Sequence, residues 1–108
     1  MTHKEFGKIQ SVKLGSGGYD DVMFGFSFTL GGNSWGVSDF WGTWQHHDKY
    51  CKWTKEDQNK IFIDSLLKVK NLLKDAKVDC FFKLAGVPVE AVFEDNTLSS
   101  WRILTEVL

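Results

Sequence analysis

The sequence contains little cysteine and almost no proline. Two cysteines, Cys51 and Cys80, and one proline, Pro88, occur among its 108 residues. Two cysteines are too few for the disulfide framework that stabilises small secreted domains. The first ten residues, MTHKEFGKIQ, hold no apolar run, so no secretory signal is expected. These absences predict a protein with reduced thiols in a cytoplasm.

The chain also lacks an excess of charge of one sign and any long apolar run. The formal net charge is −1, which gives no broad attraction to DNA, RNA or anionic lipid. Its apolar runs are far too short to cross a bilayer. We therefore expect neither a nucleic-acid nor a membrane partner. The length predicts one domain, residues 1–108, with a core large enough to fold alone.

Motifs that name a reaction or a metal are missing. The sequence holds no phosphate loop, nucleophile elbow, catalytic triad pattern or HExxH helix. Four neighbouring residues have side chains that can bind metal: His46, His47, Asp48 and Cys51. A structural zinc site needs a second close pair, and Cys80 and His3 do not form one. We therefore predict no metal and no cofactor.

Alternating apolar residues give the clearest strand signal, at residues 22–30. One face of VMFGFSFTL carries Val22, Phe24, Phe26, Phe28 and Leu30. Strict alternation is typical of a strand with one face in the core. Residues 7–14 form a weaker strand, joined to it by a glycine-rich turn at 15–21. Residues 35–44 alternate well enough for a third strand.

A long helix is predicted at residues 55–76. Thr54 suits the N-cap position, and an acid, Asp57, follows three residues later. Apolar residues then recur at helical spacing: Phe62, Ile63, Leu66, Val69, Leu72, Leu73 and Ala76. Such a stripe is expected to pack on the sheet.

Two more strands are predicted after the helix, at residues 87–94 and 98–104, with a two-residue turn between them. In this register Val89 and Ala91 lie on one face, and Trp101 and Ile103 lie on the other. A sheet that is apolar on both faces needs cover on both, and one helix covers only one. The second cover would be the segment 34–53, a ligand or a partner chain, and we predict a homodimer.

Together these elements predict an α+β fold. It has a largely antiparallel sheet of about four or five strands, with one long helix packed on a face. The expected order is three strands, the helix and two strands.

The segment 34–53, SWGVSDFWGTWQHHDKYCKW, holds four of the five tryptophans. Its rings could line a pocket for a planar ligand, or they could form a small core or a subunit interface. Gly36 and Gly42 permit close approach of a backbone or a ring under either interpretation. The residues expected to contact a ligand or partner are Tyr19, Trp35, Asp39, Phe40, Trp41, Trp44 and Arg102.

Asp39 and Arg102 are the charged members of this set. A buried carboxylate between apolar residues is costly unless it is paired or hydrogen-bonded. Asp39 could contact a ligand, form an acid/base pair with Asp20 or Asp21, point to solvent, or accept backbone N–H bonds. Arg102, the only arginine, could pair with such an acid, hold an anion, or lie exposed at a sheet edge.

Three blocks carry a family resemblance: SGGYDDVMFGFSFTLGG at 16–32, WGVSDFWGTW at 35–44 and WRILTEVL at 101–108. Between them WTKEDQ and GVPVEAVFEDNTL stand in the expected order. The chain resembles, over most of its length, a family of small proteins encoded by bacteriophages and prophages. The resemblance implies no catalytic residue. It implies a cytoplasmic protein of the host bacterium that acts by binding.

The expected function is that of a non-enzymatic phage accessory protein that inhibits or sequesters a host or defence component. One alternative is a sponge that binds a nucleotide or other planar molecule in an aromatic pocket at 35–53. Another is a small enzyme that uses Asp39 or Cys51.

Overall fold

The computed structural model describes residues 1–17, 22–45 and 52–108. Its five strands are β1 (Thr2–Gly17), β2 (Met23–Gly31), β3 (Gly36–Trp44), β4 (Pro88–Glu94) and β5 (Thr97–Ile103). One long helix, α1 (Lys55–Ala76), and two short 3₁₀ helices, η2 (Phe81–Leu84) and η3 (Thr105–Val107), complete the described chain. The sheet is antiparallel throughout, in the order β3-β2-β1-β4-β5, and α1 packs on it. The predicted α+β class is confirmed.

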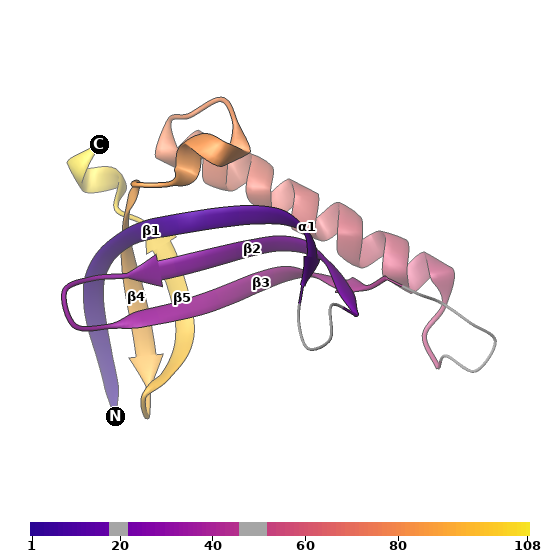
Figure 1. The fold of residues 1–108 in the computed structure, drawn as a ribbon, viewed down its shortest axis with the longest axis horizontal. Coiled ribbons are helices and arrows are strands. Elements are labelled where there is room, and N and C mark those ends of the chain that lie inside the picture. Colours follow the sequence, from indigo (N-terminus) through magenta and orange to yellow (C-terminus); the bar gives the residue numbers. More distant parts are fainter. Residues whose placement is uncertain (18–21, 46–51) are drawn as a thin grey trace.

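β1 is a long bent strand that joins two hairpins. Residues 2–8 pair with β4, and residues 8–17 pair with β2. The register shifts between Ile9 and Ser11, which leaves Gln10 as an extra residue. A bulge of this kind bends a strand and increases its twist. The β2–β3 hairpin therefore crosses the β4–β5 hairpin at a steep angle (Figure 1).

The first strand is much longer than the predicted 7–14. Residues 2–6 lack apolar alternation, yet they are held in the sheet because β4 pairs with them. Gly15 and Gly17 were expected in a turn but extend the strand opposite β2. Strand formation here depends on the neighbouring strands more than on local propensity.

The helix begins and ends where the sequence predicts. The Thr54 hydroxyl accepts a hydrogen bond from the Asp57 backbone N–H, and the Asp57 carboxylate accepts one from the Thr54 N–H. This is the predicted capping box. Lys77 ends the helix in the left-handed conformation, with φ 59°.

The face of α1 that packs on the sheet matches the predicted stripe only in part, at Val69, Leu72 and Ala76. The buried helix residues are Gln58, Ser65, Val69, Leu72 and Ala76. Leu66, expected in the core, keeps 59% of its surface exposed. Near the start of the helix, the buried Gln58 donates to the backbone carbonyls of Trp44 and Gln45 at the end of β3. Hydrogen bonds from Gln58 thus take the place of apolar packing near the start of the helix. Several apolar residues remain on the helix surface.

The β4–β5 hairpin has the predicted turn, but its faces were assigned wrongly. Asp95 and Asn96 both have positive φ, as a tight two-residue turn requires. The register then shifts, so that Ala91 pairs with Trp101 and Val89 pairs with Ile103. Residues directly opposite one another share a face, so these four apolar residues lie together.

This correction removes the argument for a second cover. The prediction placed Trp101 and Ile103 on the opposite face because it assumed an uninterrupted hairpin. The bulge reverses their side, and the pairs on the other face are Glu90 with Arg102 and Val92 with Ser100. The homodimer stays a prediction without its original structural reason.

Candidate functional site

Two tryptophans from opposite edges of the sheet meet over Asp39. Trp41 on β3 and Trp101 on β5 stack with ring centroids 5.5 Å apart and an interplanar angle of 15°. Asp39 Oδ2 accepts hydrogen bonds from Trp101 Nε1 at 2.7 Å and from Trp41 Nε1 at 3.1 Å. Asp39 Oδ1 accepts from the Phe40 backbone N–H at 2.8 Å. We call Asp39, Trp41 and Trp101 the indole clamp.

Phe28 forms the base of the indole clamp. Its ring is fully buried and lies 4.5 Å from Trp41 and 5.2 Å from Trp101, centroid to centroid. Lys68 on α1 places its Nζ 5.4 Å from the centre of the Trp41 ring. The rings of the indole clamp thus contact one another, Phe28 and the helix. This arrangement favours the packing interpretation of Trp41 over a ring that stands free for a ligand.

The other predicted site residues do not join this cluster. Trp35 Nε1 donates to the Phe6 carbonyl at 3.3 Å, and its ring packs edge-on against Phe93. Phe40 and Trp44 lie on the face of β3 opposite to Asp39 and Trp41, because side chains alternate along a strand. Three separate places therefore hold residues that the sequence analysis grouped together.

Several predicted residues lie outside the described part of the chain. They are Tyr19, the possible acid/base partners Asp20 and Asp21, and the possible metal ligands His46, His47, Asp48 and Cys51. Among residues 1–17, 22–45 and 52–108, no group of three metal-binding side chains comes together.

Arg102 pairs with acids, but not with Asp39. Its guanidinium donates to both carboxylate oxygens of Glu106, at 2.8 and 2.7 Å, and to Glu90 Oε1 at 3.3 Å. These bonds raise the pKa of Arg102 and lower the pKa of Glu106 to about 2. The arrangement attaches η3 to β5 and leaves Arg102 with no evident role in a site around Asp39.

The Glu106 carboxylate is expected to titrate with a pKa of about 2, because the hydrogen bonds from Arg102 stabilise its charged form. A group whose pKa is lowered on folding stabilises the native state above its unfolded pKa and loses that contribution as pH falls through the folded value. The contribution should therefore disappear between about pH 4.5 and pH 2. Carbon-detected NMR titration measures this pKa, and Arg102→Met should return it toward 4.5. An ordinary pKa in the unmodified protein would contradict the pairing.

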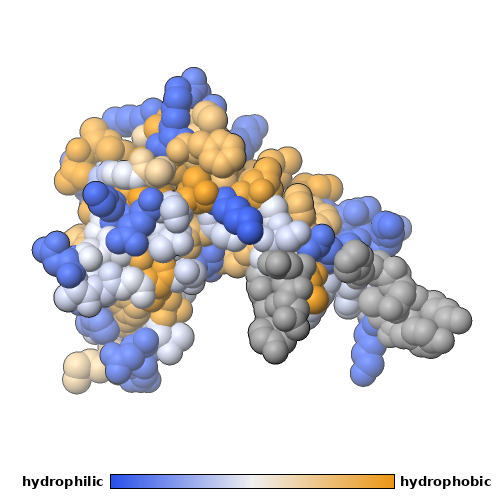
Figure 2. Space-filling view, viewed as in Figure 1, coloured by the Kyte–Doolittle hydropathy of each residue, from blue (hydrophilic) through white to orange (hydrophobic). Residues whose placement is uncertain are grey.

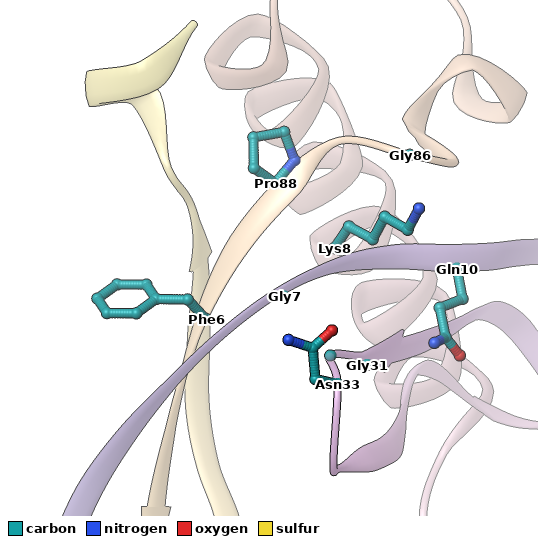
Figure 3. Close-up of a pocket in the computed structure, with 9 residues that line it drawn as sticks. Phe6, Gly7, Lys8, Gln10, Gly31, Asn33, Gly86 and Pro88 are labelled. Atoms are coloured by element: carbon teal, nitrogen blue, oxygen red, sulfur yellow. The ribbon is translucent and has the colours of Figure 1, made fainter.

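A polar pocket lies at the bend of β1. It has a volume of about 400 Å³. Figure 3 shows Lys8, Gln10 and Asn33 around backbone that includes Gly31 and Gly86. All three polar side chains are solvent-exposed. Because none of them is held in place by burial, the pocket offers little preorganised recognition.

An apolar groove runs between β1 and α1. Six residues define this β1–α1 groove: Leu14, Phe24, Phe26, Trp41, Phe62 and Leu66. Its volume is about 210 Å³, and its walls are almost wholly apolar. Leu14, Phe24 and Leu66 are all exposed, and Ile63 adds a further exposed side chain one residue beyond Phe62. Figure 2 shows hydrophobic residues gathered over the seam between β1 and α1 and around η2.

The sequence analysis missed the β1–α1 groove, although a signal for it was present. The helix carries apolar residues over a wider arc than one sheet contact can bury: Ile61, Phe62, Ile63, Leu66, Leu67, Val69, Leu72 and Leu73. A helix that packs on one sheet normally has an apolar stripe on one side only. The excess indicates a second contact along the helix.

Comparison with protein families, with curated proteins and with solved structures found no match. None of the helices in residues 1–17, 22–45 and 52–108 carries a hydrophobic stretch of the length that a membrane span requires.

Proposed function

We propose that this chain acts by binding another protein, and that the β1–α1 groove is its contact surface. The observation that carries the proposal is the row of exposed apolar side chains along the groove, which continues from Leu14 and Phe24 on the sheet to Leu66 on the helix. Contiguous exposed apolar surface is unfavourable in water unless it has a use, and such patches mark interaction sites.

The size and chemistry of the groove favour protein side chains over a small molecule. Sites for small ligands usually occupy about 300–1,000 Å³ and combine apolar walls with a few fixed polar groups. The β1–α1 groove has about 210 Å³ and offers almost no polar surface. A few apolar side chains of a partner fit such a space, whereas the polar groups of a nucleotide would find almost no hydrogen-bond partner in its walls.

The two alternative functions gain less support. The sponge hypothesis needs free aromatic faces, and the Trp41 ring packs against Phe28 and Trp101. The enzyme hypothesis needs an available Asp39 carboxylate, and three donors occupy its oxygens. Its other candidate nucleophile, Cys51, lies outside the described residues.

The resemblance to small phage-encoded proteins supplies the context of the proposal. It suggests a host or defence protein as the partner, met in the cytoplasm of the host bacterium. The predicted homodimer remains part of this proposal, and analytical ultracentrifugation tests it.

Leu66→Asp is expected to remove partner binding, because a carboxylate would be placed in an apolar contact. Leu67→Asp is the matched control, since Leu67 is 50% exposed against 59% for Leu66 and stands on the far side of the helix. Each variant would be mixed with bacterial lysate, and captured proteins would be quantified and cross-linked to locate the contact.

The expected result is a captured protein whose yield falls at least about tenfold with Leu66→Asp and is unchanged with Leu67→Asp, with cross-links near the groove. Capture that both variants leave unchanged would overturn the proposed surface. Both variants replace exposed side chains, so melting temperatures should confirm that each protein remains folded.

A further inference from the structure

One edge of β1 is open beside the β1–α1 groove. On this side β4 pairs with β1 only as far as Lys8, and two further backbone bonds join Ile9 to Gly86 and Val87. From residue 11 to residue 17, β1 pairs with β2 on its other side. Within the described parts of the chain, no strand pairs with the open edge over residues 11–17, although η2 packs against β1 and its Phe81 ring lies 5.2 Å from the ring of Phe26, the partner of Leu14. Unpaired strand edges are templates for a further strand.

The open edge and the β1–α1 groove are parts of one surface. Val12 and Leu14 pair with Phe28 and Phe26, so their side chains share the face on which α1 lies. Leu14 itself lines the groove opposite Leu66. A strand added to residues 11–17 would place every second side chain on this face, next to Leu14 and beneath the exposed flank of the helix. The added side chains would cover apolar surface that the chain leaves exposed.

Lysine side chains lie beside this surface. Lys70 follows Leu66 at a spacing of four, which puts it on the same flank of the helix. The helix aspartates Asp57, Asp64 and Asp75 fall on the opposite flank, where Asp64 lines a separate hollow with Ile61 and Lys68. On β1, Lys13 points to the face opposite Leu14, so it would stand beside the outward side chains of an added strand.

The same charges argue against a second copy of this chain as the occupant. Two copies joined along this edge would bring two lysine-bearing surfaces together, with the helix aspartates on the distant flanks. Like charges on neighbouring strands are destabilising. A partner strand with acidic side chains on its outward face instead finds an opposite charge in Lys13.

We propose that residues 11–17 of β1 receive an extended segment of a partner protein as a sixth strand, in which apolar residues that enter the β1–α1 groove alternate with acidic residues. The inference rests on the proposed function, since it specifies how the partner occupies the groove. The edge of seven residues spans about 24 Å at about 3.4 Å per residue, so it accommodates a segment of roughly seven or eight residues. Main-chain hydrogen bonds would supply affinity, and the groove would supply specificity.

Selection of random peptides of about ten residues on the immobilised protein, followed by hydrogen exchange of the complex, tests the proposal. The selected peptides should alternate apolar and acidic residues. They should slow amide exchange at alternate residues within 11–17, and leave the outer edge of β5 unchanged as an internal control. Leu66→Asp should remove binding and Leu67→Asp should not. Lys13→Glu should weaken peptide binding by roughly two- to fivefold, as expected for one cross-strand charge pair.

Three results of the peptide experiment would overturn the inference. They are failure to enrich any peptide, enrichment of peptides without alternation, and binding that leaves exchange at residues 11–17 unchanged. A dimer of the protein that protects residues 11–17 would also overturn it, because a second copy would then be the occupant. Binding of a host protein that depends on Leu66 but leaves these amides unprotected would contradict the added strand and still support the proposed function.

Discussion

Phe28→Ala is expected to lower the free energy of unfolding by about 3–5 kcal/mol. The Phe28 side chain is fully buried and contacts Trp41, Trp101 and Phe81, which come from three different elements. Its removal would leave a cavity that the stacked indoles cannot fill without losing their bonds to Asp39. For a domain of this size the melting temperature should fall by about 10 °C or more. Urea denaturation followed by tryptophan fluorescence measures the effect.

Phe24→Ala is the matched control for this prediction. Phe24 lies on the same strand and the same face as Phe28, but 40% of its surface is exposed. Its replacement should cost only about 1–2 kcal/mol, in proportion to the smaller buried area. Equal decreases in the free energy of unfolding for Phe28→Ala and Phe24→Ala would show that the core is not centred on Phe28.

Asp39→Ala is expected to lower the free energy of unfolding by about 2–4 kcal/mol, although it removes a carboxylate from a largely apolar environment. The loss arises because the indole N–H groups of Trp41 and Trp101 and the Phe40 N–H would lose their acceptor. Asp39→Asn retains one acceptor oxygen, so its free energy of unfolding should fall by about half as much. Chemical denaturation of the three proteins gives the comparison.

Asp64→Ala serves as the control for charge, because Asp64 is an exposed acid on the nearby helix. It should change stability by less than about 0.5 kcal/mol. The enzyme hypothesis expects Asp39→Asn to remove an activity while the fold stays intact. An Asp39→Ala protein with unchanged stability would therefore contradict the indole clamp and return Asp39 to the list of catalytic candidates.

The position of the β1–α1 groove shows why the candidate site could be predicted only in part. The sequence analysis selected the tryptophan-rich segment because aromatic rings concentrate there. In the fold, Trp41 stacks on Trp101, whereas Trp35 contacts Phe6 and Trp44 lies on the opposite face of β3. The exposed apolar surface instead combines Leu14, Phe24 and Leu66, which lie far apart along the chain and have no local motif in common.

Local physical chemistry in the sequence determined the strand at 22–30, the helix limits and the turn at Asp95 and Asn96. Each depends on side-chain periodicity, a cap or positive φ within a few residues. Only the tertiary structure decided the length and bend of β1, the face of Trp101 and the exposure of Leu66. A bulge of one residue reverses every side chain beyond it, and the bond between Trp101 and Asp39 joins residues 62 positions apart. Which surfaces remain open is decided by such contacts, because burial depends on the elements that pack together and not on the pattern of any one of them.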